Sequence, residues 1–255
     1  MTHAVQNPPT PRKPPIVLDA MLLVALLSRV EAVLGSLQDV DDSSVFDELC
    51  RRCVREFVIT GAGVTVFVDG SPQGALGVSD ELSRRVEELQ FTYGEGPCVD
   101  ANRTRQAVSE PRLSSALSRW PVFGPAAVNV GVEAVFAIPL QLGDATYGAL
   151  DLYRDTPGPL AAGELDDAAA IADAAVVLIL ALQQAAAPGT LTPALDDMAD
   201  YRAVVHQAVG MVSVQLEVTV DEALVALRAR AFQAGIAIGD LATDVVARRM
   251  RLDEP

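Results

Sequence analysis

The sequence predicts an α+β domain with an antiparallel sheet, followed by a small all-α domain of three helices. Two observations indicate the first domain: segments rich in β-branched residues alternate with helical stretches, and two of these segments flank a short turn at Gly143-Asp144. The third observation is that the last quarter of the chain shows only helical spacing of its apolar residues. With 255 residues, 50% of them hydrophobic, the chain is long enough to form two hydrophobic cores.

Composition shifts along the chain predict its division. Residues 1–15 contain five prolines and few core-forming residues, so we expect a disordered tail there. The stretch from Ala185 to Pro193 contains two prolines and a glycine, which predicts a break between the domains. The expected organisation is a tail at 1–15, a first domain at 16–187, a linker at 188–198 and a helical domain at 199–255.

The elements of the first domain follow from local patterns. Apolar spacing, β-branched runs and turn residues predict helices and strands in alternation. In order they are a helix over 16–37, a helix from Ser43 or Ser44 to Phe57, strands over 64–68 and 75–78, a helix over 80–89, strands over 134–140 and 147–153, and a helix from about 163 to 187.

Two apolar stretches raise the question of a membrane. The run from Met21 to Leu27 follows Arg12 and Lys13, but Asp19 intervenes and no small-residue cleavage site follows, which favours a packing helix over a signal peptide. The stretch over 168–187 contains Asp173, and an Asp at bilayer depth costs about 2.5 to 3.5 kcal/mol. We therefore expect no membrane segment, and a buried helix that could also form the seam of a homodimer.

Three helices are predicted in the last quarter. Val205, Ala208 and Val212 fall on one side of the first helix. The second helix begins at Thr219, which forms a capping-box pattern with Glu222, and it ends at Gly235. A third helix continues from Ile238 to Val245, with Arg248, Arg249 and Arg251 near its negative end.

No catalytic, metal or cofactor site is predicted. The two histidines are His3, in the tail, and His206, in the helical domain, so a Ser/His/Asp or Cys/His site would need an unusual arrangement. Cys50 and Cys53 share an apolar helical stripe and lack a second ligand pair, which favours buried thiols over zinc ligands. Three cysteines suit a reducing compartment, so we expect a cytoplasmic protein.

The charge is distributed unevenly. The whole chain carries a net charge of −15, which disfavours binding to polyanions over the surface as a whole. Between Arg202 and Arg251, however, six Arg stand against five acids. This segment is where a local basic patch could form, although arginines on a solvated helix surface explain the same count.

The helical segment resembles the ANTAR domain, an RNA-binding transcription antitermination module. The resemblance lies in residues that occur in the family's order: Arg202, Gln207-Ala208-x-Gly210, Asp221-Glu222-Ala223, Leu227-Arg228, Ala231 and Asp240-Leu241-Ala242-x-x-Val245-Val246. One position departs from the pattern, because Val209 stands where the family usually has a Lys near the RNA. The resemblance implies a contact surface for hairpin-loop RNA made of Arg202, His206, Gln207, Gly210 and Arg228, with Arg230 and Arg248 as weaker contacts to the backbone.

The first domain resembles a GAF sensor domain over roughly 45–182. The similar residues are Val64 to Val68, Gly94-Glu95-Gly96-Pro97-Cys98, Ala107 to Glu110, Pro139-Leu140 and Gly148 to Leu152. The run Gly94 to Cys98 is similar to that of GAF domains that precede ANTAR modules in actinobacteria. By itself this run fits either a turn in which Pro97 begins a short helix or a reactive Cys98 thiol near a helix N-terminus. A phosphate-binding loop is excluded because no Lys-Ser/Thr pair follows.

Together the two resemblances imply a signal-responsive regulator. A small molecule or protein would act on the GAF-like domain, and the ANTAR-like domain would bind hairpin loops in nascent transcripts. Two alternatives stay open: a ligand-sensing or protein-interaction regulator that has lost RNA binding, and an enzyme that uses Cys98 or a carboxylate site.

Overall fold

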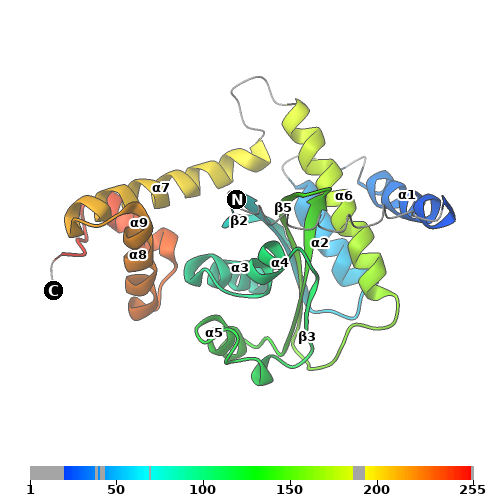
Figure 1. Ribbon diagram of the computed structural model, residues 1–255, viewed down its shortest axis with the longest axis horizontal. Coiled ribbons are helices and arrows are strands. Elements are labelled where there is room, and N and C mark those ends of the chain that lie inside the picture. The colour runs from blue at the N-terminus through cyan, green and yellow to red at the C-terminus, as the bar shows by residue number, and fades with distance from the viewer. Residues whose placement is uncertain (1–19, 38–39, 41–43, 69, 186–192, 254–255) are drawn as a thin grey trace, which may run out of the picture.

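The α+β domain has three layers, with helices on both faces of one sheet (Figure 1). A computed structural model of the protein describes residues 20–37, 40, 44–68, 70–185 and 193–253. The expected tail at 1–15 and residues 188–192 of the expected linker lie outside these residues. The α+β domain is followed by three helices that lie to one side of it.

Five antiparallel strands form the sheet, in the order β2-β1-β5-β4-β3. The expected hairpin is confirmed, because β4 and β5 pair directly across Gly143 and Asp144. Both are longer than the predicted segments. The short edge strand was not predicted. The strands are β1 (Gly61–Val68), β2 (Ser71–Val78), β3 (Val108–Glu110), β4 (Ala134–Leu142) and β5 (Ala145–Arg154).

Helices α2 (Val45–Glu56) and α6 (Glu164–Ala185) cover one face of the sheet, and α1 (Ala20–Gly35) packs against α6. The largest hydrophobic cluster lies between them and the sheet. Cys50 and Cys53 are fully buried in it as free thiols, as expected. The apolar stretch of α6 is also buried within a single chain, apart from residues such as Val177. Packing against the sheet and α1 thus accounts for most of its hydrophobic character.

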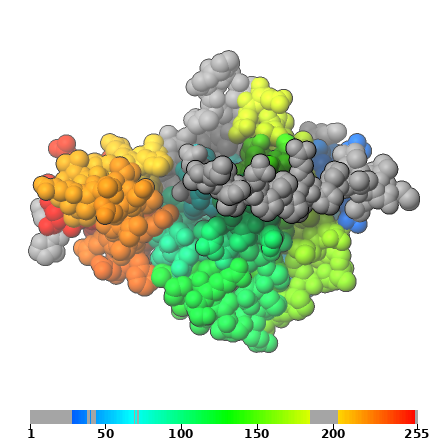
Figure 2. Space-filling view, viewed as in Figure 1, coloured from blue at the N-terminus to red at the C-terminus, as the bar shows by residue number. Residues whose placement is uncertain are grey.

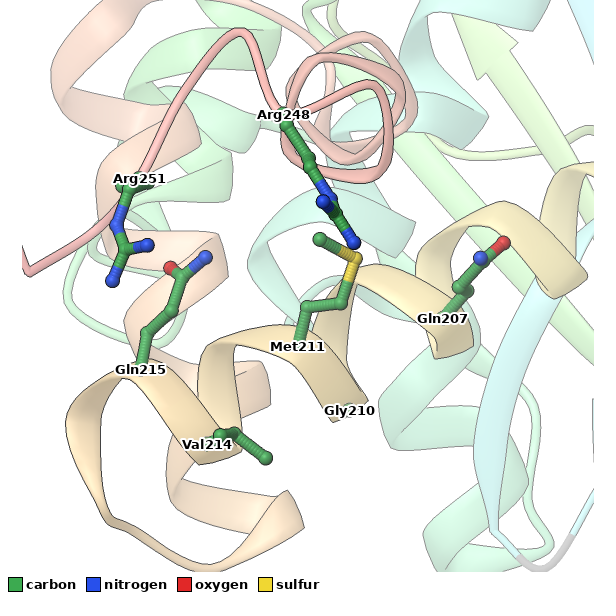
Figure 3. A pocket seen from close by; sticks show the side chains of 7 residues that line it. All are labelled: Gln207, Gly210, Met211, Val214, Gln215, Arg248 and Arg251. Atoms are coloured by element: carbon green, nitrogen blue, oxygen red, sulfur yellow. The ribbon is translucent and has the colours of Figure 1, made fainter.

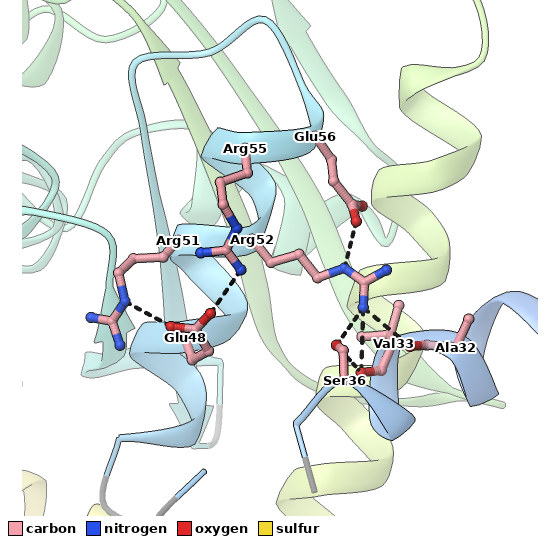
Figure 4. A network of polar contacts seen from close by, with 8 residues as sticks. All are labelled: Ala32, Val33, Ser36, Glu48, Arg51, Arg52, Arg55 and Glu56. Carbon is pink, nitrogen blue, oxygen red and sulfur yellow. Dashed lines mark hydrogen bonds and ion pairs between the residues drawn. The ribbon is translucent and has the colours of Figure 1, made fainter. Parts of the chain in front are cut away.

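An arginine of α2 holds the end of α1 in place (Figure 4). Arg52 donates from Nη1 to the carbonyls of Ala32 and Val33 and to Ser36 Oγ, while its Nε pairs with Glu56 at 2.8 Å. The last carbonyls of a helix have no partners within the helix, and a cation also suits the negative end of the dipole. Arg52 therefore fixes α1 to α2.

The other face of the sheet carries α3 (Glu81–Tyr93), α4 (Pro97–Thr104) and α5 (Phe123–Asn129). The only tryptophan of the chain, Trp120, is buried there. It lies edge-on to Phe123 and donates from Nε1 to Asp100 Oδ2 at 3.2 Å. This bond satisfies the polar atom of a large buried ring.

The last three helices are α7 (Pro193–Leu216), α8 (Val220–Ala234) and α9 (Ile238–Val246). The predicted capping box is present, because Thr219 accepts from the Glu222 amide while the Glu222 carboxylate accepts from that of Thr219. Gly235 ends α8 in the left-handed conformation, as expected. Helix α7 begins at Pro193, so residues 193–198, which were expected in the linker, are helical.

The helical domain packs against α3 of the α+β domain. Phe91 belongs to the same buried cluster as the core of the three helices, and the rings of Tyr93 and Phe232 meet edge to face at 5.7 Å. The amide of Ile238 donates to Thr92 Oγ1 at 3.4 Å. In Figure 2 the orange residues of α8 lie against the green residues of the α+β domain. The two domains thus share an interface at the C-terminal end of α3.

No single helix among the described residues is both long and apolar enough to cross a membrane. The bent pair 203–216 and 220–234 meets the length and composition criteria together, with an angle of 102° between its halves.

Candidate nucleic-acid interface

A pocket of about 490 Å³ lies on the helical domain, between α7 and the segment that follows α9. Figure 3 shows the α7 side chains on one wall and two arginines that reach toward them from the other. The amide of Leu252 donates to Gln215 Oε1 at 3.1 Å, which holds the C-terminal segment against α7. The lining residues are Gln207, Gly210, Met211, Val214, Gln215, Arg248 and Arg251.

Helical spacing explains why α7 presents these residues together. Gln207, Met211 and Gln215 recur every four positions and so share one face of the helix. The core stripe, with Val205, Ala208 and Val212, lies on another face and is buried against α8 and α9. One helix therefore serves both as a core element and as a wall of the pocket.

Arg248 supplies the unpaired positive charge of the pocket. Arg251 is in a bidentate pair with Asp253, at 2.9 and 2.6 Å, and Arg249 pairs with Asp244 at 2.7 Å. Within the described part of the chain, Arg248 has no acidic partner, and its backbone has a left-handed φ of 57°. That conformation is uncommon for a residue with a side chain. Among the described residues, Arg248 therefore directs a guanidinium without an acidic partner into a pocket whose other arginine, Arg251, is paired with Asp253.

Gly210 exposes the backbone of α7 in the pocket. A glycine within a helix costs about 0.5 to 1 kcal/mol relative to alanine. A Cβ at Gly210 would meet nothing within 4 Å, so packing does not require the glycine. Because glycine has no side chain, a bound group can approach the helix backbone closely at this position.

Three of the seven residues predicted to contact RNA meet in this pocket: Gln207, Gly210 and Arg248. His206 is exposed on α7, beside the pocket but outside its lining, and Arg230 is exposed on α8. Arg202 lies in α7, and its side chain is outside the described part of the structure.

Arg228 lies elsewhere, against the α+β domain. Its Nη2 donates to the Phe91 carbonyl at 3.4 Å, and its Nε is buried without a hydrogen-bond partner. Burial lowers the pKa of the Arg228 side chain. In this arrangement Arg228 is a contact between domains and does not share a surface with Arg248.

Val209 is also part of the packing. It is only 2% exposed and belongs to the cluster that contains Phe91. The sequence interpretation treated it as a missing cation on the RNA surface, but a lysine at this buried position could not reach solvent without a rearrangement. The substitution therefore suits the packing of α7 in this structure and removes no charge from the pocket.

Sequence reasoning missed four of the lining residues: Met211, Val214, Gln215 and Arg251. Val214 gives the clearest signal, because it lies off the core stripe and is 79% exposed. The part played by Arg251 was not predictable from spacing, since the return of the chain to α7 after α9 brings it there.

The segment from Gly94 to Cys98 forms a turn and the start of α4, with Pro97 in its first turn, as the simpler interpretation predicted. Cys98 is fully buried, and burial raises its pKa well above the usual value, an effect that Asp151 and Glu87 strengthen. The alternative interpretation, in which Cys98 is a reactive, solvent-accessible thiol with a low pKa, is therefore wrong.

Residues 194–246 match the family model of the ANTAR domain, a range that includes nearly all of α7, α8 and α9. The helical domain thus matches the ANTAR family, and a five-stranded α+β domain precedes it. None of the curated proteins compared with the chain matches it.

Solved GAF domains are similar in shape to the first domain. That of a Coxiella burnetii phosphoenolpyruvate-protein phosphotransferase is 10% identical, with a TM-score of 0.49 over 63% of this chain and 96% of that one. The GAF domain of the Acinetobacter phosphoenolpyruvate-protein phosphotransferase is 10% identical, with a TM-score of 0.47 over 67% of this chain and 99% of that one. A free methionine-R-sulfoxide reductase from Thermoplasma acidophilum is 17% identical, with a TM-score of 0.45 over 54% of this chain and 92% of that one. Likeness at this level says nothing about what this chain binds.

Proposed function

We propose that this protein is a signal-responsive, RNA-binding regulator of transcription antitermination. The ANTAR domain binds hairpin loops in nascent transcripts, and a small molecule or protein acts on the GAF-like domain. The observation that carries the proposal is the pocket in which Gln207, Gly210 and Arg248 meet. RNA loops are recognised through side chains that reach unstacked bases and through cations at phosphates, and this pocket offers both.

In the proposed complex, the electrostatic attraction between protein and RNA is confined to the pocket. The chain as a whole carries a net charge of −15, which repels RNA at long range. Arg248 lacks an acidic partner among the described residues, whereas its neighbour Arg249 is paired with Asp244. We infer that Arg248 is the main phosphate contact and that Gln207 reads a base edge.

The test is a binding titration of the full chain with a tandem-hairpin RNA at salt concentrations from about 50 to 200 mM. Replacing Arg248 with Ala should weaken binding and reduce the slope of log K against log salt by about 0.7, as expected for one lost contact to a single-stranded phosphate. Arg249→Ala is the matched control, because it removes the same charge one residue away and outside the pocket. Equal effects of the two substitutions would rule out the pocket as the phosphate contact.

A second candidate function rests on Val214. This side chain is 79% exposed and lies beside Met211 in the pocket, and an exposed apolar side chain next to a methionine suits a protein partner. On this alternative the protein is a ligand-sensing or protein-interaction regulator without RNA binding. Absence of RNA binding by the full chain at low salt would favour it.

The remaining parts of the proposal follow from the same architecture. We infer a first domain at 16–187, a helical domain that begins with α7 at Pro193, a cytoplasmic location, a non-enzymatic role and a homodimer that uses the exposed part of α6. Val177, 44% exposed on α6, is the residue with which to test the dimer. A Val177→Glu variant should sediment as a monomer at concentrations at which the wild type sediments as a dimer.

A further inference from the structure

Three acidic groups meet inside the GAF-like domain, away from the RNA pocket. They are Glu87 of α3, Cys98 of α4 and Asp151 of β5, which we call the acid–thiol cluster. One carboxylate oxygen of each acid and the Cys98 sulfur lie within 4.8 Å of one another. All three residues are buried, with Asp151 and Cys98 at 0% exposure and Glu87 at 3%.

Glu87 is held firmly in this cluster. Its carboxylate accepts from Thr65 Oγ1 at 2.5 Å, from the Tyr153 hydroxyl at 2.6 Å and from Gln90 Nε2 at 3.5 Å. Gly63 of β1 leaves space for it, because a Cβ there would overlap the carboxylate. These partners orient Glu87 beneath α3, although burial raises the pKa of its carboxyl group.

Asp151 is less well held, although its carboxyl group interacts with the side chains of Glu87 and Gln90. Neither of its oxygens receives a hydrogen bond of good geometry, although it is fully buried. Gln90 lies close enough to influence Asp151, but its amide donates to Glu87 and to the Tyr153 hydroxyl, the latter at 3.1 Å. A buried carboxyl group without a donor costs several kcal/mol if it is charged. The cluster therefore lacks a positive group at the point toward which Asp151 is directed.

Cys98 completes the set of possible ligands. Its backbone amide donates to Gln90 Oε1 at 2.9 Å, which fixes the start of α4 next to the two carboxylates. The sulfur lies beside Asp151 and Glu87, so its thiolate would add a third negative charge in the same small volume. Burial raises the pKa of all three groups, so without a cation their protonated forms are favoured, whereas a dication would balance most of the charge of two carboxylates and a thiolate.

We propose that Glu87, Cys98 and Asp151 bind one divalent transition-metal ion of the zinc class inside the sensor domain. A thiolate ligand favours zinc over magnesium or calcium, which prefer oxygen ligands alone. Ligand atoms around tetrahedral zinc lie about 3.3 to 3.8 Å apart, given Zn–O and Zn–S distances near 2.0 to 2.3 Å. The three atoms already lie within 4.8 Å, so side-chain movements of roughly one ångström complete the set.

Other residues supply the surroundings that such a site needs. Thr65, Tyr153 and Gln90 orient Glu87 from outside the ligand set, as second-sphere groups commonly do in metal sites. Three protein ligands leave a fourth tetrahedral position for water. RNA binding through Arg248 does not require this ion, so the two proposals stand independently.

The experiment uses the full chain without an affinity tag, stripped with chelator and reloaded with Zn²⁺ or Co²⁺. We expect one zinc per chain by elemental analysis, and a thiolate-to-cobalt charge-transfer band with Co²⁺. Asp151→Asn and Cys98→Ser should each weaken Zn²⁺ binding at least tenfold and abolish the band. Cys53→Ser is the matched control, since it removes a fully buried thiol on the other face of the sheet and should leave the metal content unchanged.

Circular dichroism of each stripped variant checks that it folds. Asp151→Asn removes an unpartnered buried charge, so its stripped form should be folded and no less stable than the stripped wild type. Zn²⁺ should raise the Tm of the wild type and of Cys53→Ser but not that of Asp151→Asn. Folded wild type without stoichiometric zinc would overturn the proposal, as would zinc retained equally by Asp151→Asn and Cys98→Ser.

Discussion

Arg228 of α8 donates from Nη2 to the backbone carbonyl of Phe91, at 3.4 Å, across the interface between the two domains. Its guanidinium also lies against Gly94, where a Cβ would overlap it. Helix α3 therefore contacts the ANTAR domain at its C-terminal end, while Glu87 and Gln90 of the same helix reach the acid–thiol cluster. Helix α3 thus connects the interior of the α+β domain to the helical domain.

The first prediction concerns this contact. Arg228→Ala should loosen the interface, because it removes a hydrogen bond worth about 1 kcal/mol and the packing of the side-chain stem. Hydrogen exchange should become faster at the end of α3 and in α8. RNA affinity should stay the same or rise, since Arg228 does not line the pocket.

Arg230→Ala provides the control for that experiment, because Arg230 is exposed on the same helix. It should leave hydrogen exchange at α3 unchanged. A loss of RNA affinity and of salt slope in Arg228→Ala, with exchange unaffected, would instead place Arg228 at the RNA, as the family resemblance implies.

Gly210→Ala should separate stability from binding. A Cβ at this position meets no other atom within 4 Å, so the substitution should stabilise the helical domain by about 0.5 to 1 kcal/mol. The same methyl group would occupy the surface of the pocket and should weaken RNA binding. Chemical denaturation and RNA titration measure the two effects. Unchanged RNA affinity would show that no bound group approaches this part of the backbone.

The capping box of α8 gives a third prediction. Thr219→Ala removes the hydroxyl that accepts from the Glu222 amide and should destabilise the helical domain by about 0.5 to 2 kcal/mol. Urea denaturation monitored by circular dichroism provides the measurement. The neighbouring Val220→Ala substitution changes an exposed residue without a capping role and should have a much smaller effect.

A fourth prediction is a pH dependence of stability. Burial raises the pKa of Asp173 on α6 above its ordinary value of 3.8. A raised folded-state pKa means that the folded state binds the proton more tightly, so stability is highest below the unfolded-state pKa and falls as pH rises through the folded-state value. Asp173→Asn should therefore gain stability relative to the wild type as pH rises from about 4 toward neutrality.

Asp166→Asn is the natural comparison for that series. Asp166 is exposed in the first turn of α6, where a negative charge suits the helix dipole. Its replacement should bring no gain at neutral pH. Equal pH profiles for wild type and Asp173→Asn would contradict the burial effect.

Local patterns predicted most of the fold. The hairpin at Gly143-Asp144, the capping box at Thr219 and the stop at Gly235 appear as expected, because each depends on residues within a few positions of one another. The short strand β3 and the helix α5 were missed. Both are brief segments that neighbouring elements stabilise, so their own sequences carry little periodicity.

The residues of the two sites were likewise predicted only where local patterns specify them. Sequence by itself determined the helical core stripes, the ANTAR resemblance and three pocket residues, Gln207, Gly210 and Arg248, because helical spacing and motif order are local properties. Only the tertiary structure decided that Arg228 belongs to the interface with α3 and that Val209 is buried in the core of the helical domain. It also brought together Glu87, Cys98 and Asp151, which lie on three separate elements. The physical reason is that burial and charge proximity depend on which faces pack together, and no local pattern specifies that pairing.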